Sequence, residues 1–328
     1  MSIPRKLPTK VKLVVTIPAY NEESTIVSVI NSIPSVIEGV HDIRILVVDD
    51  GSSDQTAARA TKAGARVVSN AMNRGLAYTF SRGLEEALGM GADIIVNTDA
   101  DNQYDQSQIP QLIQPILNRQ ADMVLGSRFK GHIEDMSFSK RWGNQLASRV
   151  VKWVSGLNIS DGQTGFRAFT RDAALRLNIF SSFTYTQETI LEAADKKMRV
   201  VEIPCTFRKR ADKNRLFAGV FDYARRAIMT LVVGALKYHP IKTFGYAGIG
   251  LVIIGGIIGL PVAELFWSTG SVGPFTLRAI ATGIFFILGF QLIFLGFIAE
   301  LLKHNRQIAE RQLVEAKRAR LDNVSRAN

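Results

Sequence analysis

The chain has 328 residues, 47% of them hydrophobic, and carries a formal net charge of +11. This length accommodates one large domain or two smaller ones. A basic balance without a recognisable nucleic-acid-binding motif indicates anionic small substrates and an anionic membrane surface as partners, and no nucleic acid. Because Cys205 is the only cysteine, an internal disulfide is excluded.

Short apolar runs alternate with helical patterns over about the first 130 residues. Strands are predicted at residues 11–17, 43–48, 65–69, 94–96 and 123–125. Helices are predicted between them, at residues 55–63, 75–89 and 109–117. This alternation predicts an α/β fold with a mostly parallel sheet, in which ligands bind beyond the carboxyl ends of the strands. The absence of a Gly-x-Gly-x-x-Gly turn after the first strand argues against a dinucleotide-binding Rossmann domain.

An acidic stretch follows the predicted strand at 94–96. Asp99 and Asp101 lie two residues apart, so their side chains point the same way in extended chain. Two carboxylates and the amide oxygen of Gln103 suit Mg²⁺ or Mn²⁺, which prefer oxygen ligands and often also hold substrate phosphates. The alternative is an acidic surface turn. Polar clusters after three other strands, at 20–22, 49–50 and 127–128, favour a shared binding edge.

Four motifs occur in the order seen in family 2 glycosyltransferases of the Rossmann-like GT-A fold. They are Pro18-Ala19-Tyr20-Asn21-Glu22, Val48-Asp49-Asp50-Gly51-Ser52-Ser53-Asp54, Asp99-Ala100-Asp101-Asn102-Gln103 and Gly126-Ser127-Arg128. The resemblance covers residues 11–210 and is closest to dolichyl-phosphate mannose synthases and bacterial polyprenyl-phosphate sugar transferases. The chain lacks the Gln-x-x-Arg-Trp motif of the processive synthases, which argues against polysaccharide synthesis.

The resemblance implies a role for each matching residue. The nucleotide sugar would be bound by Pro18, Tyr20, Glu22, Asp50, Asp99 and Arg210. The metal that bridges the diphosphate would be held by Asp99, Asp101 and Gln103. Arg128 would face the acceptor phosphate with Arg141, and these two arginines form the predicted catalytic set with Asp101. The alternative for Arg128 is a pair with a nearby carboxylate.

Three further features near the sugar remain open between a functional and a structural interpretation. The segment Gln163-Thr164-Gly165-Phe166-Arg167 resembles a family block near the sugar, which makes Arg167 a candidate contact. Gln187 and Glu188 begin a predicted helix at 186–194, where Glu188 either accepts from a sugar hydroxyl or is a favourable charge at the helix N-terminus. The basic loop at 208–215 is either a phosphate clamp or a solvated charge run.

Two uncharged spans of about 21 residues each lie between Lys242 and Glu264 and between Arg278 and Glu300, enough to cross a bilayer. The glycines at 255 and 259 would let the two helices approach closely. The predicted domains are a glycosyltransferase domain (1–215), interfacial amphipathic helices (216–242), transmembrane helices (243–266 and 277–302) and a charged helical tail (303–328). Flanking basic residues place the catalytic domain and both termini in the cytoplasm. The tail is a solvated helix or a packing arm for a neighbouring subunit of a homo-oligomer.

The expected reaction transfers a hexose, with inversion, from GDP-mannose or UDP-glucose to polyprenyl (dolichyl or undecaprenyl) phosphate. A phosphate monoester, whose second pKa is about 6, is already largely ionised near neutral pH. The nucleophile therefore needs positioning and nearby cations more than a general base. One alternative is a membrane lipid with a hydroxyl acceptor, for which Asp101 or Glu188 would be the base. The other is a non-catalytic membrane scaffold.

Overall fold

The protein was analysed as a computed structural model that describes residues 8, 10–134, 136, 138–179, 185–209 and 240–327. The chain forms two compact units, residues 1–227 with 312–328, and residues 228–311. Arg210, most of the predicted basic loop, and the predicted interfacial helices up to residue 239 lie outside the described residues.

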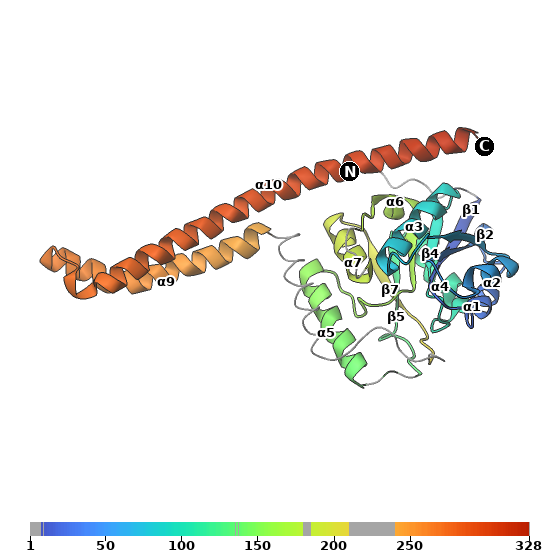
Figure 1. Cartoon of the computed structure of the whole chain (residues 1–328), viewed down its shortest axis with the longest axis horizontal. Helices are drawn as coiled ribbons and strands as arrows, with labels where there is room; N and C mark the ends of the chain where they lie inside the picture. Colours follow the sequence, from blue (N-terminus) through green and yellow to red (C-terminus); the bar gives the residue numbers. More distant parts are fainter. Residues whose placement is uncertain are drawn as a thin grey trace. The chain divides into compact units, whose positions relative to one another are not determined.

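The first unit is built on a seven-stranded sheet with the strand order β3-β2-β1-β4-β6-β5-β7 (Figure 1). Only β6 runs antiparallel to its neighbours among these strands. The strands are β1 (Val11–Ala19), β2 (Val40–Asp49), β3 (Arg66–Ser69), β4 (Ile94–Asn97), β5 (Met123–Ser127), β6 (Arg167–Thr170) and β7 (Val200–Pro204). The predicted α/β fold with a mostly parallel sheet is therefore confirmed.

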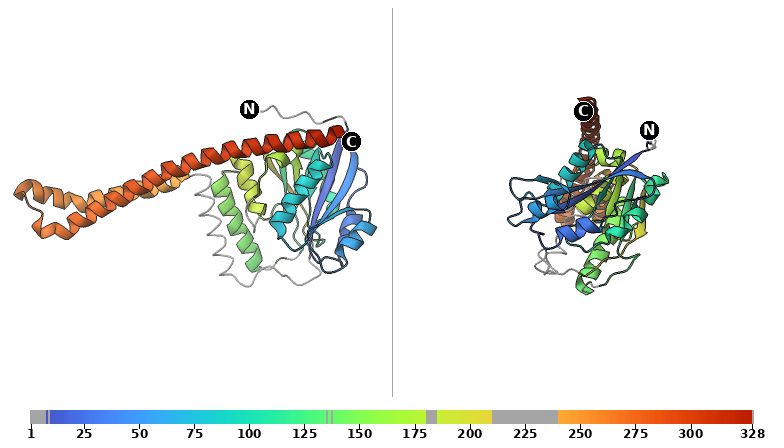
Figure 2. Two further views of the ribbon diagram at one scale, coloured as in Figure 1. Left: turned by 45° about the horizontal axis from the view of Figure 1, so that its top comes forward. Right: turned by 90° about the vertical axis from the view of Figure 1, so that its right-hand side faces the viewer.

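Helices cover both faces of this sheet (Figure 1, Figure 2). One face packs on α1 (Ile26–Ser32), α2 (Thr56–Lys62), the short 3-10 helix η1 (Gln106–Gln108) and α4 (Ile109–Leu117). The other packs on α3 (Leu76–Gly89), which contacts α6 (Arg171–Arg176) and α7 (Tyr185–Asp195). Helix α5 (Phe138–Ser155) packs on α7. Because both faces are covered, the central strands are fully buried, as the unbroken apolar run Ile94-Ile95-Val96 predicts.

The antiparallel strand β6 was not predicted. It has only four residues, Arg-Ala-Phe-Thr, and is too short to show a period of two. It begins with Arg167, which sequence analysis placed in a ligand-binding block. The insertion of β6 between β4 and β5 brings residues 161–166 to the carboxyl ends of the parallel strands.

The second unit contains two helices long and apolar enough to cross a membrane, α9 (Pro240–Thr269) and α10 (Thr276–Ala327), joined through η2 (Gly273–Phe275). Both exceed their predicted bounds, and the predicted tail continues α10 without a break. Glycines line the contact between the two helices: a Cβ atom on Gly248 would lie 2.6 Å from the carbonyl oxygen of Gly289. Gly255 and Gly259 lie at the same contact, facing Phe285 and Thr282. The close approach predicted at these two glycines is confirmed.

The last part of α10 belongs to the first unit. Lys317 lies 3.6 Å from Glu85 of α3, and Arg318 lies 2.5 Å from Asp172 of α6. Lys317 also donates a hydrogen bond to Asn178. This last part of α10 thus packs on α3 and α6 of the first unit, which neither sequence-based alternative anticipated.

Candidate active site

The strand register brings the predicted loops to one edge of the sheet. Asn97 of β4 and Leu125 of β5 both pair with Arg167 of β6. Two residues beyond this row, toward the carboxyl ends of the parallel strands, lie Asp99, Ser127 and Gly165. At the same edge, Ala19 of β1 pairs with Asp49 of β2. The sheet therefore brings together four polar segments that are far apart in the sequence.

The loops after β1 and β2 are joined by hydrogen bonds. The backbone N–H of Ser53 donates to the side-chain oxygen of Asn21 (2.9 Å), and Asn21 itself has a φ of 53°. The backbone N–H of Glu22 donates to the Thr56 hydroxyl (2.9 Å). Glu22 is half-buried, whereas Tyr20 is 43% exposed at the edge. Tyr20 can therefore contact a ligand directly, while buried Pro18 supports the loop from within β1.

Asp50 is buried at the predicted edge, but its carboxylate is occupied. It accepts hydrogen bonds from the Asn70 side-chain amide (2.7 Å) and from the backbone N–H groups of Arg74 (2.9 Å) and Gly75 (2.9 Å). These bonds fix the turn that precedes α3. Asp50 therefore supports the turn between β3 and α3.

The carboxylate of Asp99 lies against the backbone of Gly165. A Cβ atom at Gly165 would be 2.6 Å from one Asp99 carboxylate oxygen and 2.7 Å from the other. Gly165 is held from both sides, because its N–H donates to the Tyr104 hydroxyl (2.9 Å) and its carbonyl accepts from the Asn97 amide (2.8 Å). Only glycine fits this position without displacing the half-buried carboxylate.

Asp101 and Gln103 lie half-buried in the next turn. The backbone N–H of Gln103 donates to Asp101 (3.1 Å), and the Gln103 carbonyl accepts from the N–H of Arg208 (2.7 Å). The described residues contain no cluster of three or more His, Cys, Asp or Glu side chains suited to a metal. Two carboxylates and an amide oxygen nevertheless fit Mg²⁺ or Mn²⁺ when a substrate diphosphate completes the coordination.

Two buried tyrosines stand behind the Asp99 carboxylate. Burial raises the pKa of both Tyr104 and Tyr185, and the negative charge of Asp99 raises it further. Both hydroxyls therefore stay protonated. The Tyr185 hydroxyl accepts a hydrogen bond from Asn97 (3.2 Å), and its ring stacks on Phe80.

Arg167 does not reach the surface. It is fully buried, and its guanidinium donates to the backbone carbonyls of Thr164 (2.8 Å) and Gly162 (3.3 Å) and to the Thr189 hydroxyl. Burial lowers the pKa of Arg167 to about 10, so the side chain remains charged near neutral pH. The structure gives it the role of holding the 162–164 loop.

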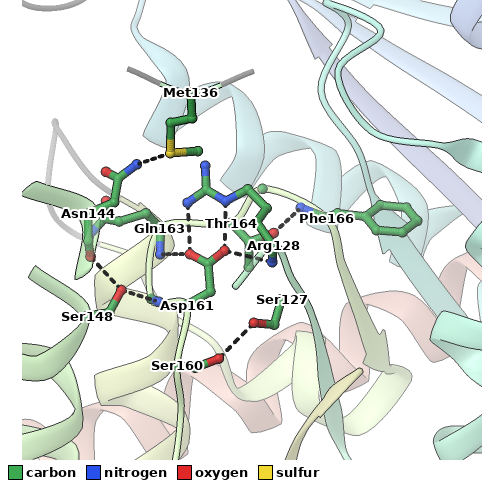
Figure 3. A network of polar contacts seen from close by, with 12 residues as sticks. Ser127, Arg128, Met136, Asn144, Ser148, Ser160, Asp161, Gln163, Thr164 and Phe166 are labelled. Carbon is green, nitrogen blue, oxygen red and sulfur yellow. Dashed lines mark hydrogen bonds and ion pairs between the residues drawn. The ribbon is translucent and has the colours of Figure 1, made fainter. Parts of the chain in front are cut away.

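Arg128 forms a buried ion pair with Asp161 (Figure 3). Its Nε donates to one carboxylate oxygen (2.7 Å) and its Nη2 to the other (2.8 Å), while its backbone N–H adds a third bond (3.0 Å). Burial alone would raise the pKa of Asp161, but the Arg128 guanidinium outweighs this and holds that pKa below its usual range. The carboxylate partner that sequence analysis left as an alternative is thus present.

The Asp161 loop is supported by Glu202 of β7. This buried carboxylate accepts from the backbone N–H groups of Ser160 (2.8 Å) and Asp161 (2.9 Å), and pairs with Lys130 (3.0 Å). Sequence analysis missed both Asp161 and Glu202. An available signal was the lone acidic residue inside the otherwise uncharged strand Val-Val-Glu-Ile-Pro, which requires buried partners.

The remaining predicted residues lie on α5 and α7. Arg141 is exposed in the first turns of α5 and makes no hydrogen bond or ion pair with the residues that the structure describes. Gln187 and Glu188 are buried at the start of α7. The side-chain oxygen of Gln187 is buried without a partner among the described residues.

Residues 14–177, half of the chain, match the family described as Glycosyl transferase family 2. The chain belongs to this family and is a glycosyltransferase. The dolichol-phosphate mannosyltransferase of Pyrococcus furiosus is 30% identical over 255 residues, covering 74% of this chain and 70% of that protein. The UDP-N-acetylglucosamine–dolichyl-phosphate N-acetylglucosaminyltransferase of Methanococcus voltae is 30% identical over 214 residues, covering 57% and 82%.

A solved structure shows the same fold. Glucosyl-3-phosphoglycerate synthase from Mycobacterium tuberculosis, in complex with Mn²⁺, UDP and glucosyl-3-phosphoglycerate, aligns with a TM-score of 0.52 and 24% identity. The alignment covers 69% of this chain and 78% of that one. This likeness confirms the predicted GT-A fold.

We expect Asp161→Asn to destabilise the protein by about 3–5 kcal/mol, because it leaves the buried Arg128 without its counter-charge. The pKa of Asp161 is depressed in the folded state, so the pair contributes its full stability above the usual carboxyl pKa of about 4. That contribution is lost as the pH falls through the lower folded value. Urea unfolding of the detergent-solubilised chain at neutral and acidic pH measures both effects.

Asp42→Asn is the matched control, because Asp42 pairs with Arg44 at the exposed surface. Its expected cost is at most about 1 kcal/mol. Equal shifts of the unfolding midpoint in the two variants would refute a stabilising role for the Arg128–Asp161 pair.

Proposed function

We propose that the protein transfers a hexose from a nucleotide sugar to a polyprenyl phosphate at the membrane, with inversion of the anomeric carbon. The observation that carries this proposal is the sheet edge itself, where the Asp99 carboxylate lies against Gly165 and the strands β1, β2 and β5 end. Relatives of the chain are polyprenyl-phosphate sugar transferases. Two candidate membrane-spanning helices fit a lipid acceptor.

The nucleotide side of the site is formed by the loops after β1 and β2. Exposed Tyr20 offers a ring to the base, and Glu22 lies in the loop that hydrogen bonds tie to Thr56. Asp50 fixes the neighbouring turn. We propose GDP-mannose or UDP-glucose as the donor. Relatives are named for the transfer of mannose and of N-acetylglucosamine, so sugar specificity differs among them. A panel of nucleotide sugars is therefore the test that identifies the donor of this protein.

A divalent cation, Mg²⁺ or Mn²⁺, fits Asp99, Asp101 and Gln103. When bound, such an ion offsets the charge that develops on the leaving diphosphate. The chain's own contribution is to hold the two carboxylates in place. Gly165 leaves room for Asp99, and the Gln103–Arg208 backbone bond fixes the turn that carries Asp101.

The acceptor phosphate is already anionic and attacks the anomeric carbon directly, so the site must position it and balance its charge. Asp161 neutralises Arg128 through Nε and Nη2, and no hydrogen bond among the described residues uses Nη1. Figure 3 shows Nη1 on the side of Met136, away from Asp161. We propose that Arg128 contributes this one nitrogen, and that exposed Arg141 supplies the uncompensated positive charge.

A hydroxyl acceptor would need a general base. No contact among the described residues marks Asp101 or Glu188 as that base, so we prefer the phosphate acceptor, which needs none. Family membership favours catalysis over a scaffold role.

The function is tested by incubating the purified full chain with labelled nucleotide sugars and either a polyprenyl phosphate or the matching polyprenol. We expect a labelled lipid that mild acid cleaves, formed from the phosphate alone. A chelator should abolish turnover, and Mg²⁺ or Mn²⁺ should restore it. Asp101→Ala should lower turnover by at least about 100-fold, since a bound cation supplies several kcal/mol of transition-state stabilisation.

Asp42→Ala, which removes a carboxylate far from the edge, is the matched control and should keep full turnover. Product formed equally from polyprenol would contradict the phosphate acceptor. Full turnover in excess chelator would contradict the metal.

We further propose that the catalytic unit and both termini are cytoplasmic, because basic residues flank the outer ends of the spans and the loop between them is uncharged. Single cysteines at exposed Ser271 and exposed Ala319 should react with an impermeant maleimide from opposite sides of sealed vesicles. Cys205 need not be replaced, because burial raises its pKa to about 12 and suppresses its reactivity. Labelling of both sites from one side would refute this topology.

A further inference from the structure

Helix α5 has a buried face and an outer face of unusual composition. Ala147, Val151 and Val154 are buried against the catalytic unit. On the outer face, Trp142, Leu146 and Trp153 are 55%, 38% and 77% exposed. With Arg149 they are spaced at 142, 146, 149 and 153, which places them on a single stripe of the helix.

The charge of this helix has a single sign. Its sequence, FSKRWGNQLASRVVKWVS, contains four basic residues and no acidic one. Arg141, Arg149 and Lys152 are all exposed beside the stripe. Exposed apolar residues are ordinary when they occur singly, but two tryptophans and a leucine in one row on a helix whose charges are all basic are not.

This combination matches the surface of a bilayer with anionic head groups. Indole rings favour the boundary between head groups and acyl chains, because they carry an apolar body and one polar N–H. Basic side chains beside them meet lipid phosphates. The two tryptophans stand about 16 Å apart along the helix, so the whole stripe can lie flat on such a surface.

The chain itself brings α5 to a membrane. The candidate membrane-spanning helices α9 and α10 belong to the same polypeptide, which makes contact between α5 and a bilayer intramolecular and raises its effective concentration. We propose that the outer face of α5, formed by Trp142, Leu146, Arg149 and Trp153, docks in the interfacial layer of an anionic membrane.

The buried face of α5 links this surface to the acceptor side of the site. The Ser148 hydroxyl accepts a hydrogen bond from the backbone N–H of Gly162 (2.9 Å), the residue after Asp161. Arg141 lies in the first turns of the same helix. If the proposed function holds, docking would set the acceptor loop at the depth of a lipid phosphate. The docking itself does not depend on the reaction.

The test uses the full chain in single-copy nanodiscs that contain bromine-labelled phospholipid. A Trp267→Phe background leaves Trp142 and Trp153 as the only tryptophans, since the chain has three. With anionic lipid present, we expect their emission to shift to the blue and to be quenched by bromine. High salt should weaken the quenching, because salt screens the basic residues.

Arg149→Glu with Lys152→Glu should lower the docking equilibrium by at least about tenfold, since basic residues near an anionic surface attract it and acidic ones are repelled. The matched control, Lys62→Glu with Lys197→Glu, changes the same charge at exposed sites outside α5 and should leave quenching unchanged. Circular dichroism confirms folding. The dependence of bromine quenching on salt and on anionic lipid, measured with the stripe unaltered, provides a second test that needs no charge variant.

The proposal would be overturned if acrylamide quenched the emission and bromine-labelled lipid did not, because the stripe would then face water. Emission shielded from both quenchers would also overturn it, because another protein surface would then cover the stripe. Equal quenching in neutral and anionic discs would refute the preference for anionic lipid.

Discussion

The contact between Gly165 and the Asp99 carboxylate depends on the one antiparallel strand in the sheet. β6 enters between β4 and β5, so the residues just before it pass across the ends of the strands that carry Asp99 and Arg128. Hydrogen bonds from Asn97 and to Tyr104 then fix Gly165. The carboxylate proposed to bind metal is therefore positioned by backbone geometry, which is stiffer than a contact between two long side chains.

The same crossing segment also holds the proposed acceptor side of the site. Asp161 lies four residues before Gly165 and closes a buried ion pair with Arg128, and Glu202 holds the loop from β7. Arg128, Asp161, Glu202 and Lys130 together carry no net charge. Such a cluster is costly to desolvate, and removing one of its charges is costly too, because the partner is then buried without a counter-charge. Because it is neutral, the proposed charge balance for a lipid phosphate depends on Arg141.

The sequence predicted those parts of the fold that follow from continuous local patterns. The apolar runs at 11–17 and 94–96 are long enough to identify buried parallel strands, and the Asp-x-Asp turn after β4 falls at the predicted edge. Four-residue β6 has no such pattern. Its place depends on pairing with β4 and β5, and even β5, the nearer of the two in the sequence, pairs with residues more than 40 positions away. No local sequence pattern indicates such a pairing.

The parts of the site that could not be predicted from the sequence are contacts between distant segments. Arg128 could be recognised as a charged residue after a strand, but its partner Asp161 lies 33 residues further along. Arg167 and Asp50 were predicted to contact ligand. The structure adds that each also forms hydrogen bonds to nearby loop groups, which no local pattern indicates. The packing of Lys317 on Glu85 joins residues that are far apart in the sequence, so a local charge pattern could indicate only a helix.

The most direct test of this account is Gly165→Ala. The added Cβ would fall 2.6 Å from an Asp99 oxygen and displace the carboxylate, so calorimetry with a nucleoside diphosphate and Mn²⁺ should show at least about tenfold weaker metal-dependent binding. Gly162→Ala is the control, because its Cβ would meet Val151 at an ordinary 3.5 Å, and it should bind like the unaltered protein. Unchanged metal-dependent binding in a folded Gly165→Ala protein would contradict the central claim that this glycine sets the position of the Asp99 carboxylate.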